Sequence, residues 1–180
     1  ANPESCLTLE GEGMQRWVYK LATATARMEG SLSVVTITGV VTNETAALIL
    51  QDNAQWLGRS GALAQIACYR GACMAIDPQA LLSSASAVLS VNHKLETPTA
   101  LLISESRAMW DTYCTLMASQ GIARAPFASF DAGLSWAAGQ AVVLAEMRRG
   151  SGRAACGTES RAHAPSEPGR SRAPASSRPG

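Results

Sequence analysis

The stretch SLSVVTITGVV, residues 31–41, decides the fold together with the segment TNETAALILQDNAQWL, residues 42–57, that directly follows it. The first segment is rich in Val, Ile and Thr, whose branched side chains favour a strand. The second opens with Thr42, a residue type preferred at helix N-caps, and its apolar residues recur at steps of three and four from Ala47 to Leu57. A strand that leads directly into an amphipathic helix is typical of α/β proteins.

Toward the N-terminus, the sequence predicts a second strand at residues 15–27. The turn residues Glu29-Gly30-Ser31 separate it from the strand at 31–41, so the two strands are predicted to form a β-hairpin. Residues 1–13 are acidic, contain glycine and hold a single short apolar stretch. We therefore expect 1–13 to be a flexible extension and the structured domain to begin at Met14.

Toward the C-terminus, strand and helix patterns alternate. The predicted strands are 62–69, 99–104 and 124–130, and the predicted helices follow the caps Asp77, Ser106 and Asp131. The resulting order is β-β-α-β-α-β-α-β-α. This order predicts an α/β fold with a central mixed sheet of about five strands and four helices.

The end of the chain has a different composition. From Arg148 onward there are seven arginines and two acidic residues, and after Met147 there is no Leu, Ile, Val, Met or aromatic residue. Such a segment cannot bury enough apolar surface to offset the entropy cost of ordering it. We expect 148–180 to be a disordered basic tail rich in Gly, Pro, Ser and Arg, and 14–147 to be the folded domain.

Composition also excludes several classes of protein. Residues 1–147 carry eight basic and twelve acidic side chains, a balance that argues against binding nucleic acid. No apolar run is long enough to span a membrane, and the N-terminus does not read as a secretory signal. We expect a cytoplasmic protein with reduced thiols.

No catalytic motif is present in the sequence. It contains no Walker A phrase, no G-x-G-x-x-G after a strand and no G-x-S-x-G elbow. His93 lies at a predicted helix end and His163 in the predicted tail. Cys68 and Cys73 are not accompanied by a second Cys or His pair at the spacing that a metal site requires. We therefore expect no enzyme activity, no cofactor and no metal.

The element order over residues 15–146 resembles the STAS domain of anti-sigma-factor antagonists and of related single-domain bacterial STAS-like proteins, which are also compared with the lipid-carrying CRAL-TRIO fold. The phrases that carry the resemblance are SLSVVTITGVVTNETAALIL (31–50), ALAQIACYRGACMAIDPQALL (62–82), TPTALLIS (97–104) and MASQGIARAPFASFDAGLSWAA (117–138). The resemblance implies a regulatory protein without enzyme activity. None of these phrases is catalytic.

One departure from the family pattern concerns phosphorylation. In phosphorylatable members, an Asp-Ser-Ser-Gly-like phrase opens the second helix and carries the phosphoacceptor serine. Here Asp77 matches, but Pro78 stands where the hydroxyl would be. Ser83 and Ser84 lie about a turn and a half further along the helix. The resemblance therefore implies a module that lacks the usual phosphoserine switch.

Two functional hypotheses follow for the predicted domain. The first is docking of a protein partner near the strand-to-helix loop 70–78, with Tyr69, Arg70 and Asp77 as polar contacts. The alternative is a carrier that holds a small apolar or lipid-like ligand between helices and sheet. A pocket of several hundred Å³ would favour the carrier, and a solid core with an exposed apolar patch near 70–90 would favour the module. A homo-oligomer is compatible with either.

Overall fold

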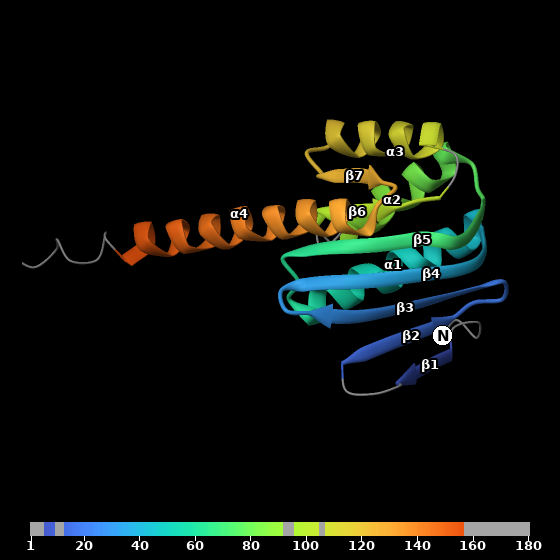
Figure 1. Ribbon diagram of the computed structural model, residues 1–180, viewed down its shortest axis with the longest axis horizontal. Helices are drawn as coiled ribbons and strands as arrows, with labels where there is room; N and C mark the ends of the chain where they lie inside the picture. Colours follow the sequence, from blue (N-terminus) through green and yellow to red (C-terminus); the bar gives the residue numbers. More distant parts are fainter. Residues whose placement is uncertain (1–5, 10–12, 92–95, 105–106, 157–180) are drawn as a thin grey trace, which may run out of the picture.

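In the computed structural model, which describes residues 6–9, 13–91, 96–104 and 107–156, the strands form one mixed sheet (Figure 1). The strands are β1 (Cys6–Leu9), β2 (Met14–Val18), β3 (Ala22–Glu29), β4 (Leu32–Thr42), β5 (Ala64–Ala75), β6 (Thr99–Leu102) and β7 (Arg124–Phe127). The helices are α1 (Asn43–Ser60), α2 (Pro78–Val91), α3 (Arg107–Ser119) and α4 (Phe130–Cys156).

The seven strands of the described residues lie in the order of the sequence, β1 to β7. Strands β1 to β4 pair antiparallel, and β4 to β7 pair parallel. Figure 1 shows α4 in front of the sheet, and α1 behind it. The predicted mixed α/β sheet and four helices are confirmed, but the sheet has seven strands and not about five.

The sheet is buried on both faces where its parallel strands lie. Val35 packs in a cluster with residues of α1, α2 and α3, whereas its neighbour Val34 packs in a second cluster with residues of α4. Leu101 and Leu102 of β6 divide between the two clusters in the same way. Successive side chains of a strand point to opposite faces, so the continuous apolar runs of β4 and β6 fit a sheet covered by helices on both sides.

The predicted strand 15–27 is two strands, β2 and β3, and this is a correction. The chain reverses after Val18, where the Tyr19 amide donates a hydrogen bond to the carbonyl of Ala22 at 2.8 Å. The apolar alternation continues across this turn, so the pattern alone does not reveal the break. The predicted hairpin is confirmed as β3 and β4, which meet at Gly30 with a φ of 62°.

The elements also depart from the predicted domain boundaries. Strand β1 at Cys6–Leu9 precedes the boundary at Met14 and pairs with β2, and α4 continues past Met147 to Cys156. The predicted flexible extension at 1–13 includes residues 1–5 and 10–12, which lie outside the described residues. The predicted disordered tail at 148–180 includes 157–180, which also lie outside them.

Two of the predicted helix caps are confirmed and one is wrong. The Thr42 hydroxyl accepts a hydrogen bond from the amide of Thr45 at 3.3 Å, and the Asp77 carboxylate accepts one from the amide of Gln79 at 3.1 Å. Asp131 lies inside the first turn of α4, because that helix begins at Phe130, two residues before the first helical position that a cap at Asp131 predicts. The predicted cap Ser106 and His93 lie outside the described residues.

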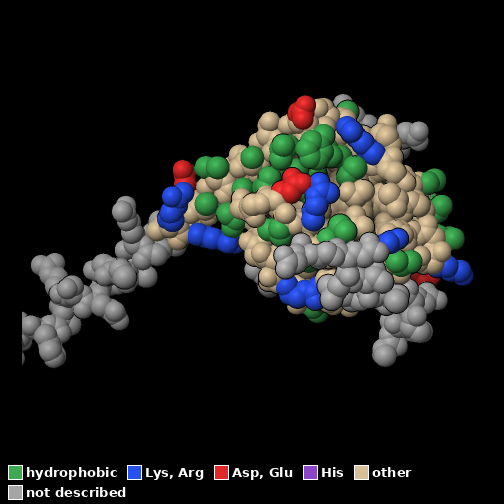
Figure 2. Space-filling view, turned by 60° about the horizontal axis from the view of Figure 1, so that its bottom comes forward, with side chains coloured by type: hydrophobic (Ala, Val, Ile, Leu, Met, Phe, Trp, Pro, Cys, Tyr) green, Lys and Arg blue, Asp and Glu red, His purple; other side chains and the backbone are tan. Residues whose placement is uncertain are grey.

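Small residues let α4 approach the sheet closely. A Cβ at Gly133 would stand 2.8 Å from Cδ2 of Leu102, and Ala137 is fully buried. Beyond Ala141 the helix leaves the sheet (Figure 1), and Val142 and Met147 are 56% and 61% exposed. Figure 2 shows hydrophobic side chains on this projecting part of α4, close to positively charged side chains near its end.

A buried polar cluster joins α1 to the sheet. The Gln65 amide donates to Oδ1 of Asn53 at 2.8 Å and accepts from Nδ2 of the same residue at 3.0 Å. Ser33 accepts from the Trp56 indole at 2.9 Å and from Gln65 at 3.3 Å. Buried polar groups cost free energy unless they are hydrogen-bonded, so this satisfied cluster fixes the position of α1 on the strands.

Candidate binding groove beside strand β5

A difference in strand length opens a groove in the sheet. Strand β5 pairs with β4 as far as Ala75, but it pairs with β6 only over Gln65–Cys68. From Arg70 to Met74, therefore, β5 has no strand partner on its β6 side among the described residues. In open α/β sheets the ligand crevice usually lies where the strand order reverses. Here the order never reverses, and the shortness of β6 produces the crevice instead.

A β-bulge marks the start of the groove. Thr36 is paired with Cys68, and the next aligned pair is Thr38 with Gly71, so two residues of β5 stand opposite one residue of β4. A bulge of this kind bends the strand and redirects side chains. A Cβ at Gly71 would lie 3.0 Å from Cγ2 of Thr38, so the absence of a side chain allows the two strands to stay close.

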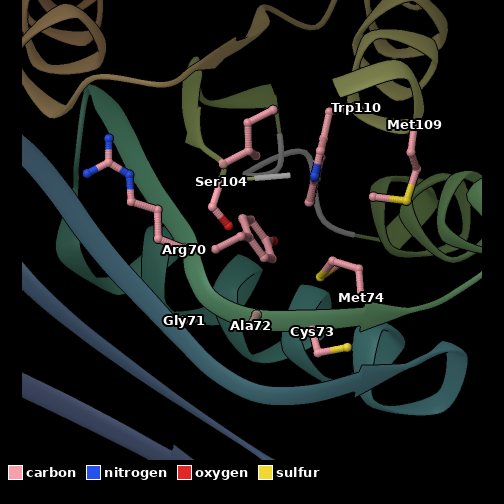
Figure 3. A pocket seen from close by; sticks show the side chains of 10 residues that line it. Arg70, Gly71, Ala72, Cys73, Met74, Ser104, Met109 and Trp110 are labelled. Carbon is pink, nitrogen blue, oxygen red and sulfur yellow. The ribbon is translucent and has the colours of Figure 1, made fainter. Parts of the chain in front are cut away.

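The groove contains a pocket of about 430 Å³. One wall is formed by β5, and the other by the residues after β6 and by the first turn of α3 (Figure 3). The lining residues are Tyr69, Arg70, Gly71, Ala72, Cys73, Met74, Ile103, Ser104, Met109 and Trp110. Figure 3 shows the Met109 and Met74 side chains on the same side of β5 as Trp110. The pocket therefore combines a strand edge with an apolar wall.

Aromatic rings make the α3 wall rigid. The ring centroids of Tyr69 and Trp110 are 4.7 Å apart, and those of Trp110 and Tyr113 are 6.1 Å apart in an edge-to-face arrangement. The Arg124 guanidinium lies 5.9 Å from the centroid of the Tyr113 ring, within range of a cation–π contact. Burial raises the pKa of the Tyr69 phenol well above its ordinary value, so this hydroxyl is neutral under physiological conditions.

Arg70 supplies the charge of the groove. It is the single charged side chain among the ten lining residues, and it is exposed. Its guanidinium donates a hydrogen bond to the carbonyl of Ala128, between β7 and α4. Figure 3 shows it pointing away from Trp110. An occupant of the groove would thus meet an apolar wall on one face of β5 and a positive charge on the other.

The structure brings together two of the three predicted contact residues. Tyr69 and Arg70 both line the pocket. Tyr69 packs against the cluster that lies under α1, α2 and α3, whereas Arg70 bonds to Ala128 just before α4. Asp77 does not line it. Its side chain caps α2, and its backbone amide donates to Oδ1 of Asn43 at 3.0 Å, which ties the starts of α1 and α2 together. The partner-binding role of all three residues stays a prediction.

Sequence reasoning missed the far wall of the pocket. Trp110 is 3% exposed, as expected for a core residue, yet it also lines the groove together with Met109 and the exposed Ser104. The helical spacing predicts that the stripe on α3 is apolar, but only tertiary structure places it opposite β5. No sequence signal singles out Ser104.

Little space is open between the sheet and the helices α1, α2 and α3 in the described part of the chain. A cavity there, lined by residues such as Ile49, Leu101 and Tyr113, measures about 20 Å³. This is about the space of one water molecule. Elsewhere, a pocket of about 190 Å³ lies between Tyr19 and the start of α1. A third, of about 280 Å³, lies over the threonine-rich sheet face beside Arg16.

Other chemical features of the described residues are simple. They contain no group of three or more His, Cys, Asp and Glu side chains that could hold a metal ion. Cys68, Cys73 and Cys114 are free thiols. In the described part of the chain, no helix has the length and apolar character needed to cross a membrane.

Comparisons with known proteins find similarity at the level of structure. No protein-family model matches the chain, and no curated protein matches it. One similar solved structure is an anti-sigma factor antagonist from Mycobacterium paratuberculosis, with 14% identity, a TM-score of 0.47, and coverage of 64% of this chain and 93% of that one. Another is the anti-sigma factor antagonist SpoIIAA in its unphosphorylated form, with 12% identity, a TM-score of 0.41, and coverage of 61% and 93%. Both are of the class that the sequence resemblance names.

Proposed function

We propose that this chain is a non-enzymatic STAS-like regulatory module that binds a protein partner in the groove beside β5. The observation that carries the proposal is the pocket of about 430 Å³ between the unpaired edge of β5 and the first turn of α3. Its position agrees with the expected docking region at 70–78. Tyr69 and Arg70 act as contacts within the groove, and Asp77 acts as a contact beyond it.

The composition of the groove suits a protein partner. Protein interfaces are enriched in aromatic residues, Met and Arg, and a few such anchors supply most of the binding energy. Trp110 and Tyr69 provide a rigid aromatic surface, and Met74 and Met109 provide adaptable side chains beside it. Arg70 at the rim adds a charge that can select and orient the partner.

The start of α2 supports a module without the usual phosphoserine switch. Pro78 is the first residue of this helix and carries no hydroxyl, and the preceding Asp77 already caps it. The Ser83 hydroxyl donates to the carbonyl of Gln79 at 2.9 Å, within the helix itself. A phosphate there would sit on the side of α2, away from the N-terminal amides that stabilise a negative charge.

The placement of the reactive side chains supports a non-enzymatic role. Asp77 caps a helix, Asp111 is exposed on α3, and Asp131 is exposed in the first turn of α4. Cys114 is buried, and burial raises the pKa of its thiol to about 11, which disfavours the nucleophilic thiolate. These groups do not converge on the groove.

A carrier of a small apolar ligand is the second candidate. The volume of the groove pocket lies in the range typical of ligand sites, and this favours the carrier. The space between the sheet and helices α1, α2 and α3 does not favour a carrier, because the cavity described there measures about 20 Å³. Any carried ligand would therefore lie in the groove, against Trp110 and Met109.

Affinity capture with matched variants tests the proposal. The immobilised chain is compared with Ser104→Trp, which fills the pocket from an exposed position, and with Gln55→Trp, which adds the same bulk at an exposed position on α1. We expect a protein retained by the wild type and by Gln55→Trp and lost with Ser104→Trp, with unchanged circular dichroism. Recovery of a small molecule alone would support the carrier. A protein retained equally by all three would contradict docking in the groove.

A further inference from the structure

We infer that the occupant of the groove is an extended segment of the partner protein, which adds to the sheet as a strand beside Arg70–Met74 and alternates apolar with acidic side chains. This inference rests on the proposed function and specifies how the partner is recognised. It commits to a peptide backbone in extended conformation, and not to a helix or a small molecule.

The hydrogen-bonding groups of β5 carry the first step. In a strand, the backbone N–H and C=O groups of successive residues point alternately to the two sides. On the β4 side, β5 is paired as far as Ala75. On the other side, pairing with β6 ends at Cys68 and no other strand in the described ranges takes its place, so every second residue of Arg70–Met74 has its backbone groups on the groove side. An exposed row of this kind is a template for another strand.

The alternative occupants leave this row unsatisfied. A small apolar ligand would contact Trp110 and Met109, but it would cover the polar edge of β5 without replacing the hydrogen bonds to water. Covering unpaired backbone groups in this way costs free energy. A bound helix pairs its backbone groups within itself, so it too would leave the backbone groups of β5 without hydrogen-bond partners. An added strand pairs with β5 and places side chains in the pocket at the same time.

The two faces of the groove determine the side chains. Neighbouring residues of an added strand point to opposite faces of the sheet. One face of the groove is lined by Tyr69, Trp110 and Met109, which suits apolar side chains. The other face carries the exposed guanidinium of Arg70, the single charge in the lining, which suits a carboxylate. Charge and strand geometry together give the alternation of apolar and acidic residues.

The chain's own C-terminal region does not have this composition. Residues 157–180 contain four arginines and two acidic residues, a net charge of the same sign as Arg70. They also contain no large apolar residue. Residues 157–180 are therefore not the complementary segment, and the inference commits to a segment of a partner protein.

Selection from a displayed library of random peptides of about seven residues tests the inference, because such a length spans the free edge of β5. We expect the wild-type chain to select peptides that alternate apolar and acidic residues. Their affinity should fall at least about tenfold with Ser104→Trp and with Arg70→Glu, and remain unchanged with Gln55→Trp. Replacing the acidic residues by Lys should restore binding to Arg70→Glu, which a merely misfolded variant could not show.

Backbone methylation of a selected peptide tests the strand itself. We expect N-methylation at every second position to weaken binding at least about tenfold, and methylation at the positions between to have little effect. A selected peptide that binds as a helix, or one whose affinity is insensitive to methylation, would overturn the inference. So would the selection of no peptide that depends on Ser104. If a protein partner is nevertheless lost with Ser104→Trp, the proposed function stands without the added strand. If neither a peptide nor a protein partner that depends on Ser104 is found, the proposed function and this inference are both wrong.

Discussion

At the scale of single residues, Gly39 holds the turn between β2 and β3 in place. Its φ is 89°, a conformation that side-chain-bearing residues rarely adopt. A Cβ there would lie 2.3 Å from the carbonyl oxygen of Leu21, which accepts a hydrogen bond from the Val40 amide at 2.7 Å. The close approach of these two backbone segments thus requires glycine.

Replacing Gly39 by Ala should destabilise the fold by about 3 kcal/mol or more, because backbone strain and a steric clash add together. The matched control is Gly30→Ala, where φ is 62° but no atom lies within 4 Å of the added Cβ. That variant should lose about 1 kcal/mol. Urea denaturation measures both free energies of unfolding, and equal losses would show that the contact with Leu21 is not tight.

The partly buried pair of Tyr19 and Asp52 should make the stability of the fold depend on pH. The Tyr19 hydroxyl donates to Oδ2 of Asp52 at 2.8 Å. Burial raises the pKa of Asp52 above its ordinary value of 3.8, although the Tyr19 hydrogen bond and the charge of Arg59 oppose the rise. The folded state therefore favours the protonated carboxyl. Its contribution to stability is complete below the unfolded-state pKa and is lost as the pH rises through the folded-state pKa.

Asp52→Asn should remove this loss, because the amide oxygen still accepts from Tyr19 but does not titrate. We expect the variant to lose less unfolding free energy than the wild type when the pH rises from about 3 to about 7. Glu146→Gln, which removes one charge at an exposed position on α4, is the control and should follow the wild type. Parallel curves for all three proteins would contradict the role of Asp52.

At the scale of elements, β5 contains two parts with different neighbours. Its residues Gln65–Cys68 lie between β4 and β6, whereas those from Gly71 to Ala75 pair with β4 and with no other strand that the structure describes. Amide hydrogen exchange should therefore be slow throughout the first part and alternate between slow and fast in the second. Mass spectrometry with electron-transfer fragmentation, or NMR, resolves single amides. Uniform protection across both parts would show that the groove is closed.

The contact between α4 and the sheet depends on small side chains. Ala137 is fully buried against the sheet, whereas the adjacent Ala138 is exposed. Ala137→Leu should cost about 2 kcal/mol because it overpacks this contact, and Ala138→Leu should change stability by less than about 0.5 kcal/mol. Thermal unfolding of the two variants compares the same substitution at a buried and at an exposed position of one helix. Similar midpoints would mean that α4 does not pack closely on β6.

At the scale of the whole molecule, two apolar clusters share one sheet. Trp17 and Trp110 belong to the cluster under α1, α2 and α3, and Trp136 packs against the cluster under α4. Because β4, β5 and β6 contribute to both clusters, we expect them to unfold together. Urea transitions followed by tryptophan fluorescence and by far-ultraviolet circular dichroism should coincide. Separate midpoints would show that one face of the sheet unfolds before the other.

The sequence predicts the layers of this molecule better than its edges. Strand β4 and helix α1 follow from β-branched residues, the Thr42 cap and helical periodicity, all of which are local. The second half of β5, around RGACMA at 70–75, lacks a strand pattern and is held by pairing with β4, so the sequence does not predict it. The groove depends on this extension and on the early end of β6. Tyr69 and Arg70 could be chosen from their place before a helix, but Ser104 could not.

The register shift between Thr36 and Thr38 has one more consequence. A long, flat strand edge without protection can pair with the same edge of other copies of the chain. Repeated pairing of this kind leads to fibrous aggregates. Here the bulge twists the edge of β5. The guanidinium of Arg70 beside this edge would also repel the Arg70 of an approaching copy. If the proposed partner segment pairs with β5, the same bulge and the same charge would make this strand edge a poor site for a second copy of the chain.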